Sequence, residues 1–154
     1  MASNWLWNNK RIKKVIYISG KIKMKVVLDS NFLFIPSQFQ VDIFEELSKL
    51  LNQRFDPIIL SSTRMELLKK MKKGSPKMRK EASLALELAE KCHLVDVEQD
   101  SEEASDDVIV RVAAEWKCPV ATNDRMLRKR LRNINVPVIY LRQKSRLEME
   151  GEGY

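Results

Sequence analysis

Short apolar runs alternate with helical patterns along most of this chain, starting near residue 24. The runs fall at 26–28, 57–60, 94–97, 119–121 and 136–141, and the helical patterns at 41–51, 63–71, 77–92, 107–116 and 124–132. Strands that are apolar throughout and separated by helices are typical of a parallel sheet covered on both faces. The sequence therefore predicts a three-layer α/β/α fold with a central parallel sheet of about five strands.

An acidic residue follows each of the first four predicted strands, namely Asp29, Glu66, Asp107 and Asp124. In a parallel sheet with right-handed crossovers, the carboxyl ends of the strands share one edge. Four carboxylates at one edge repel each other unless a cation holds them, and hard oxygen ligands suit Mg²⁺ or Mn²⁺ better than zinc. Such an ion activates water and neutralises a leaving oxyanion. The pattern indicates a metal site for phosphodiester chemistry.

Each acid also has a purely structural explanation, because acids are common at helix starts and turns. Glu66 would close a capping box with Thr63, and Asp29 would end its strand in an Asx-turn. Asp106 and Asp107 would favour a helix dipole, and Asn123 or Asp124 would cap the next helix. These explanations predict caps anywhere on the fold, whereas the four acids share one expected edge. Their common position therefore favours a site.

The positive charge of the chain is concentrated near its beginning. The 154 residues carry a formal net charge of +7. Residues 1–23 contain six basic and no acidic side chains, so the remaining 131 residues hold 22 basic and 21 acidic ones and are nearly neutral. Binding of a nucleic acid by the domain must therefore depend on the local distribution of charge.

Other motifs of catalysis and binding are absent from the sequence. Cys92 and Cys118 form no CxxC pair, so a zinc site is not indicated, and both are interpreted as core residues. His93 is interpreted as structural, and no P-loop motif occurs. No apolar run approaches the roughly 20 residues of a membrane span. A cytoplasmic protein without a membrane partner is expected.

Three regions are expected along the chain. Residues 1–23 are Asn- and Lys-rich and are predicted to be a basic extension, with Met24 as one candidate for the natural start. The alternative is that residues 15–19, which alternate in β-branched side chains, add an edge strand. Residues 24–144 form the predicted domain, and residues 145–154 a polar C-terminal tail that frays.

Residues 24–143 resemble the PIN domain, a compact metal-dependent nuclease fold. The resemblance is carried by residues 27–31 (VLDSN), by the acid Glu66, and by residues 106–113 (DDVIVRVA), 120–128 (VATNDRMLR) and 136–142 (VPVIYLR). The stretch 28–36 is similar to archaeal PIN proteins, which resemble the PIN nucleases that process small-subunit rRNA. Toxin-type PIN ribonucleases share the same acids.

The resemblance implies a set of site residues and partners. Asp29, Glu66, Asp107 and Asp124 would be catalytic and ligate the metal, Thr122 would be the hydroxyl residue near the site, and Asn31 would support the first aspartate. Asp106 is an ambiguous neighbour, and Asp107 is preferred because it directly precedes the apolar pattern of its helix. The expected partners are RNA (rRNA, tRNA or mRNA), a second copy of the chain, and an antitoxin or a ribosomal particle.

Basic residues flank the acids and are candidates for binding RNA. They are Arg125, Arg128, Lys129 and Arg130 after Asp124, and Lys69 and Lys70 after Glu66. A basic rim would draw a phosphate backbone toward the cations; the alternative is that these side chains are solvated helix faces. The leading function is a metal-dependent endoribonuclease that acts in RNA processing or as a toxin. The alternative is a catalytically weak RNA-binding or ribosome-assembly factor that keeps the fold.

Overall fold

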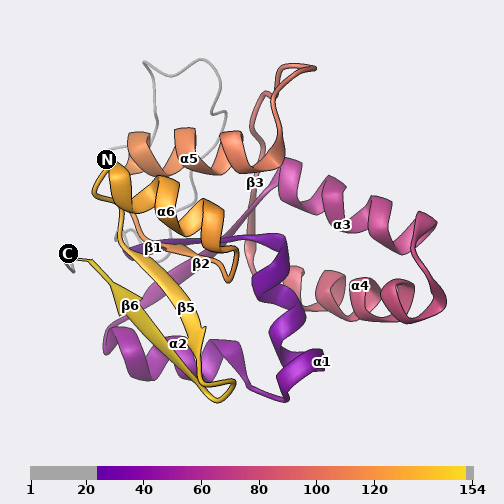
Figure 1. Ribbon diagram of the computed structural model, residues 1–154, viewed down its shortest axis with the longest axis horizontal. Helices are drawn as coiled ribbons and strands as arrows, with labels where there is room; N and C mark the ends of the chain where they lie inside the picture. The colour runs from indigo at the N-terminus through magenta and orange to yellow at the C-terminus, as the bar shows by residue number, and fades with distance from the viewer. Residues whose placement is uncertain (1–23, 152–154) are drawn as a thin grey trace.

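A six-stranded sheet lies between two layers of helices (Figure 1). The computed structural model describes residues 24–151. Its strands are β1 (Met24–Leu28), β2 (Phe55–Leu60), β3 (His93–Val95), β4 (Val120–Ala121), β5 (Val138–Arg142) and β6 (Arg146–Glu150). Its helices are η1 (Ser30–Phe34), α1 (Ile35–Phe39), α2 (Ile43–Leu51), α3 (Ser61–Lys73), α4 (Pro76–Ala89), α5 (Ser105–Trp116) and α6 (Arg125–Asn133). The predicted three-layer fold is confirmed.

The strand order is β3-β2-β1-β4-β5-β6, and the first five strands are parallel. The chain goes from β1 to β2 and β3 on one side and then returns to β4 and β5 on the other. The order therefore reverses between β1 and β4. In open α/β sheets, ligands bind beyond the carboxyl ends of the strands at this switch point.

The two layers of helices bury opposite faces of the same strands. Val26 and Leu28 of β1 point into a core shared with η1, α1, α2 and α4, whereas Val27 points into a core shared with α5 and α6. All three side chains are completely buried. Since successive residues of a strand face opposite sides, a strand covered on both faces must be apolar throughout, which explains the short apolar runs of the sequence.

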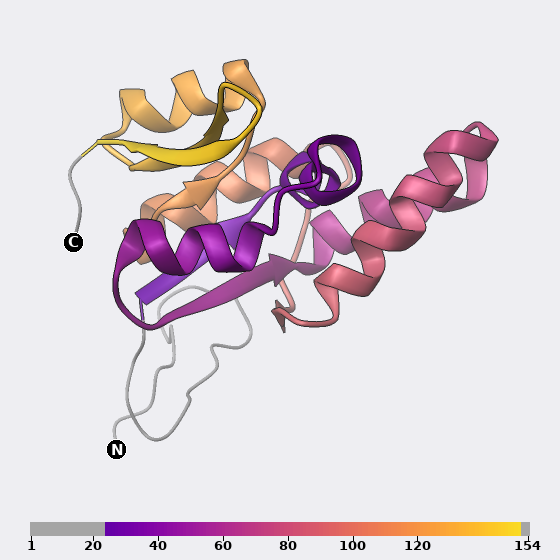
Figure 2. The same ribbon diagram turned by 90° about the horizontal axis from the view of Figure 1, so that it is seen from below.

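Helices α3 and α4 form an antiparallel pair that projects from the end of the sheet (Figure 2). Helix α3 begins at Ser61, directly after β2, so Thr63 is a buried residue of its first turn and not a cap. The capping box proposed for Thr63 and Glu66 is therefore absent, and Glu66 lies in the second turn. Pro76 starts α4, and Ser75 caps it by accepting a hydrogen bond from the Met78 amide at 3.2 Å.

The expectation of a fraying tail from residue 145 is wrong for residues 146–150, which form β6. Strand β6 pairs antiparallel with β5, and Leu147 is buried in the core. Gln143 and Lys144 have φ angles of +54° and +60°, and the Ser145 amide donates to the Arg142 carbonyl at 3.2 Å. Two left-handed residues at the centre of a hairpin turn define type I′, which normally carries Asn or Gly. Because neither central residue is Asn or Gly, the sequence did not indicate this turn.

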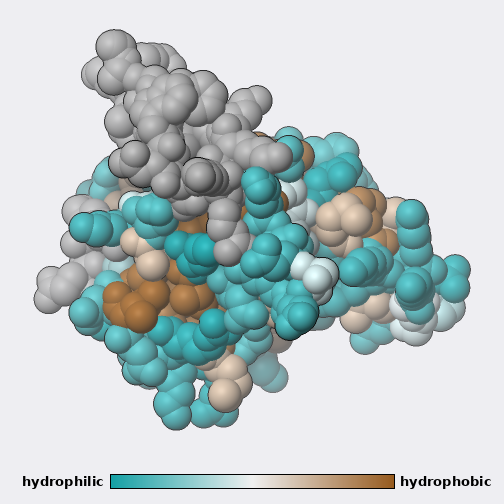
Figure 3. Space-filling model, turned by 90° about the horizontal axis from the view of Figure 1, so that it is seen from above, coloured by the Kyte–Doolittle hydropathy of each residue, from teal (hydrophilic) through white to brown (hydrophobic). Residues whose placement is uncertain are grey.

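Helices η1 and α1, which fill residues 30–39 between β1 and α2, were not predicted. The predictions for residues 1–23, including an edge strand at 15–19, lie outside the described residues. No helix in the described part of the chain is long and apolar enough to cross a membrane. On the face seen from above, the surface is mostly hydrophilic and is interrupted by separate hydrophobic patches (Figure 3).

Candidate active site at the carboxyl edge of the sheet

Asp29 and Thr122 meet where β1 and β4 end side by side. The Asp29 amide donates to the Ala121 carbonyl at 3.0 Å, which continues the pairing of the two strands. The Thr122 hydroxyl donates to Asp29 Oδ2 at 2.7 Å, and the Ser30 amide donates to Oδ1 at 2.8 Å. Both side chains are buried, with Asp29 only 3% exposed. The Asx-turn expected at Asp29 is not formed, because Oδ1 accepts from the amide of the next residue, Ser30, and not from that of Asn31. The carboxyl lies at the switch point.

Asn31 and Asn123 connect this pair to the neighbouring strand. Asn31 Oδ1 accepts from the Asn123 amide at 3.0 Å and from the Thr122 hydroxyl at 3.3 Å. Asn123 Oδ1 in turn accepts from the Leu141 amide of β5 at 2.8 Å. The loop after β4 is therefore tied to η1 on one side and to β5 on the other. Asn31 was expected to support Asp29, but its hydrogen bonds hold the loop that carries Thr122 and Asp124.

Asp124 caps α6 and faces the same edge. Its Oδ1 accepts from the amides of Met126 and Leu127 at 2.9 and 3.2 Å, and its own amide donates to the Thr122 hydroxyl oxygen at 3.0 Å. The purely structural explanation of Asp124, as a helix cap, is thus correct. However, the cap uses one oxygen, and Oδ2 has no hydrogen bond to any described residue.

Glu66 and Asp106 bring negative charge to Asp29 from two further helices. The pKa of the Asp29 carboxyl is raised to about 6, mainly by burial and also by the nearby charges of Asp106 and Glu66, although the hydrogen bonds from Thr122 and Ser30 lower it. The pKa of Asp106 is also raised, first by burial and then by the charges of Asp124 and Glu66. Four carboxylates from β1, α3, α5 and α6 therefore act on one another at this edge.

Asp107 is turned away from this group and is engaged in structural contacts. Its Oδ2 accepts from the Ala104 amide at 3.1 Å, which caps the start of α5, and its Oδ1 lies 2.9 Å from Arg130 Nη2 of α6. The Ala104 amide and the Arg130 guanidinium hold the pKa of the Asp107 carboxyl below its ordinary value. The sequence analysis preferred Asp107 to Asp106, and the geometry favours Asp106 instead.

The four carboxylates are the type of ligand that a hard divalent cation prefers, although they do not lie close together. All four acids supply carboxylate oxygens, and the raised pKa of Asp29 reflects a buried charge without a neighbouring cation. No group of three or more His, Cys, Asp or Glu within residues 24–151 is drawn together as tightly as a formed metal site. Glu66 and Asp106 are both only partly buried, so their side chains have room to rotate.

The predicted RNA-binding residues divide into three positions. Lys69 and Lys70 lie one turn after Glu66 on α3, where Lys69 is exposed and Lys70 Nζ lies 5.3 Å from the centre of the Phe34 ring. Arg130 is paired with Asp107 on α5. The remaining three, Arg125, Arg128 and Lys129, border a groove on the other side of α6.

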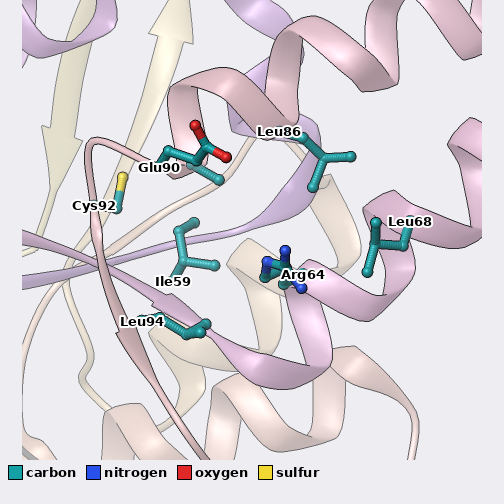
Figure 4. A pocket seen from close by; sticks show the side chains of 8 residues that line it. Ile59, Arg64, Leu68, Leu86, Glu90, Cys92 and Leu94 are labelled. Atoms are coloured by element: carbon teal, nitrogen blue, oxygen red, sulfur yellow. The ribbon is translucent and has the colours of Figure 1, made fainter.

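A separate apolar pocket of about 340 Å³ lies under the α3–α4 pair (Figure 4). Ile59, Leu68 and Leu86 form much of its wall, and Arg64 and Glu90 contribute the charged groups. Cys92 also lines it, and burial raises the pKa of this thiol to about 12, so the sulfur is not a nucleophile at neutral pH. None of the predicted site residues lines this pocket, which is therefore distinct from the acidic edge.

Comparison with known proteins identifies the family to which this fold and its acidic edge belong. Residues 26–144 match the family model described as PIN like domain. The chain belongs to this family, and the resemblance drawn from the sequence is confirmed.

Relatives within the family include archaeal ribonucleases. The chain is 29% identical over 127 residues to ribonuclease VapC4 of Methanocaldococcus jannaschii, covering 82% of this chain and 97% of the relative. It is 27% identical over 132 residues to ribonuclease VapC9 of Archaeoglobus fulgidus, covering 86% and 93%.

Two solved structures share the fold. The PIN domain endonuclease Utp24 aligns with a TM-score of 0.69 and 29% identity, over 83% of this chain and 92% of that one. VapBC2 from Rickettsia felis, bound to a DNA fragment from its promoter, aligns with a TM-score of 0.56 and 16% identity, over 77% of this chain and all of that one. The second likeness concerns the fold alone.

Proposed function

We propose that this protein is a divalent-metal-dependent endoribonuclease that hydrolyses phosphodiester bonds in RNA. The observation that carries the proposal is the gathering of Asp29, Glu66, Asp106 and Asp124 at the switch point of a PIN-like sheet. Relatives named as ribonucleases and an endonuclease of the same fold support the reaction class. The substrate is RNA, and the reaction releases two shorter RNA chains.

The metal ligands in this proposal are Asp29, Asp106 and Asp124, with Glu66 as a further ligand or as the group that orients the attacking water. A bound Mg²⁺ or Mn²⁺ supplies an activated water and neutralises charge on the phosphate oxygens. Because the four carboxylates are not drawn together as they stand, Glu66 and Asp106 would have to change rotamer to hold the cation. Asp107 is not a ligand in this proposal, since the Arg130 guanidinium already pairs with its negative charge and its other oxygen caps α5.

Thr122 and Asn31 act by positioning. The Thr122 hydroxyl bridges two of the proposed ligands, because it donates to Asp29 Oδ2 and accepts from the Asp124 amide. Asn31 fixes the same loop through the Asn123 amide. Groups that orient ligands in this way typically contribute about 10–100-fold to metal affinity or activity.

The relatives support two alternative biological roles. The relatives called VapC support a toxin-type ribonuclease with an antitoxin partner, and the likeness to Utp24 supports an RNA-processing role. In either role, the proposal is that the protein acts on RNA in the cytoplasm, as a homodimer or on a ribosomal particle. Sequencing the ends of cleaved rRNA, tRNA and mRNA from cells that express the protein separates the two.

The first test is cleavage of RNA with and without metal. The parent protein is expected to cleave single-stranded or structured RNA with Mg²⁺ or Mn²⁺ and to stop when EDTA is added. Asp29→Asn removes a ligand charge and should reduce the rate at least about 100-fold, more than loss of a group that only orients a ligand. Asp42→Asn is a matched control, because Asp42 caps α2 through the amides of Phe44 and Glu45 on an exposed surface and should keep full activity.

Two outcomes would count against this function. Equal cleavage by the parent and by Asp29→Asn would assign the activity to a contaminant. RNA binding without cleavage by either protein would support the alternative, an RNA-binding or ribosome-assembly factor that keeps the fold.

A further inference from the structure

A basic groove of about 590 Å³ runs between α6 and β6, outside the acidic edge. Its charged lining residues are Arg125, Arg128, Lys129, Arg132 and Glu150, so four cations face one anion. Met126, which is 71% exposed, and Asn133 complete the lining. The groove therefore concentrates positive charge on a domain that is nearly neutral as a whole.

The cations of this groove have no ion-pair partner in the described part of the chain. Within residues 24–151, none of the four forms a salt bridge, whereas Arg130 on the opposite side of α6 is paired with Asp107. The guanidinium of Arg128 stacks on the Tyr140 ring of β5 at 4.2 Å from its centre, and its buried Nε has no hydrogen-bond partner. Arg132 Nη1 donates to the Val136 carbonyl at 3.2 Å, which fixes the far end of the groove.

The helix that lines the groove starts at the proposed catalytic centre, because Asp124 is the N-cap of α6. Arg125 directly follows Asp124, and α6 extends the basic surface over about 10 Å from Arg125 to Arg132. A polyanion bound at the acidic edge would thus continue naturally along α6. Arginine and lysine side chains are the usual partners of phosphate oxygens in nucleic acids.

We propose that this groove anchors the phosphate backbone of the RNA beyond the bond that is cleaved. The proposal rests on RNA being the substrate, as stated above. Among the described residues no aromatic side chain lines the groove, and Arg128 covers the neighbouring Tyr140 ring, so the contacts are to the backbone and not to stacked bases. The groove therefore gives affinity that depends on RNA length and salt, and it gives little base preference.

The test measures RNA affinity in the Asp29→Asn background, where no substrate is consumed. Fluorescence anisotropy would compare a dinucleotide of uridine with a long poly-uridine RNA over a range of salt. Lys129→Glu should weaken binding of the long RNA at least about fivefold and lower the salt slope by about 1, without effect on the dinucleotide. Arg54→Glu, an equally exposed reversal before β2 at the opposite end of the strands, should change affinity less than about twofold.

A second variant changes the charge of the groove in the opposite direction and should strengthen RNA binding, a result that loss of folding cannot produce. Glu150→Lys removes the one anion of the groove and should tighten binding of the long RNA by about threefold or more. Equal losses of RNA affinity in Lys129→Glu and Arg54→Glu, or no increase in affinity with Glu150→Lys, would contradict RNA binding by the groove. This holds even if the parent protein cleaves RNA. Groove-dependent binding by a protein that never cleaves RNA would support the groove and reject the nuclease function.

Discussion

Two adjacent aspartates at the start of α5 have opposite surroundings. Asp106 shares the acidic edge with Asp29, Glu66 and Asp124, whereas Asp107 is held by Ala104 and Arg130. Consecutive residues of a helix point about 100° apart, so only one of them can face the site. The capping contact with Ala104 decides which one it is, and a sequence pattern does not reveal that contact.

This difference predicts unequal effects of the same substitution. Asp106→Asn should reduce metal-dependent cleavage at least about 100-fold, because it removes a proposed ligand. Asp107→Asn should keep the metal requirement and cost some thermal stability, because it weakens the α5 cap and the pair with Arg130. Cleavage rates and melting curves of both variants would check this. The opposite ranking of the two rates would restore Asp107 as the ligand.

The buried carboxyl of Asp29 should make the metal-free fold sensitive to pH. Its pKa of about 6 in the folded protein lies above the ordinary 3.8, so the folded state favours the protonated form. The cost of ionising Asp29 is absent below about pH 4, grows as the pH rises through 6, and is complete above that value, at most about 3 kcal/mol. Asp29→Asn lacks this cost.

Urea unfolding without metal is the measurement for this prediction. The stability of Asp29→Asn relative to the parent should rise between about pH 4 and pH 8. Adding Mg²⁺ or Mn²⁺ at neutral pH should stabilise the parent more than the variant, because a cation offsets the buried charge. A stability difference that does not vary with pH would mean that Asp29 is not buried as the structure shows.

At the scale of elements, β6 forms one edge of the sheet and contributes to the core. Leu147 is 5% exposed and packs in the same core as α2, and Leu141 and Met149 pack against that core. Strand β6 also supplies Glu150 to the basic groove. Residues 146–150 are therefore part of the folded domain.

Truncating the buried leucine tests this role. Leu147→Ala should lower the free energy of unfolding by about 2–4 kcal/mol, the usual cost of a cavity at a buried leucine. Leu84→Ala on α4 is the matched control, since Leu84 is 41% exposed, and it should change stability by less than about 0.5 kcal/mol. Chemical denaturation of both variants provides the comparison. Equal, small effects would show that β6 detaches in solution.

At the scale of the whole molecule, the sequence predicted the layers and the parallel strands because buried parallel strands leave a strong apolar signal. It predicted the edge where the acids gather because that edge follows from topology. It failed at β6, whose type I′ turn is built from Gln143 and Lys144 without glycine. It also failed to separate Arg130 from the other basic residues of α6, because ion pairs between helices depend on packing that no local pattern encodes.

The reversal of strand order between β1 and β4 also determines when the site can form during synthesis. Asp29 and Thr122 are 93 residues apart, and their strands pair directly. A chain emerging from the ribosome has Asp29 and Glu66 long before Thr122 and Asp124, so the acidic edge is incomplete until β4 and α6 have emerged. A nuclease that used the proposed site would therefore stay inactive toward the RNA of its own translation machinery until the domain was almost finished.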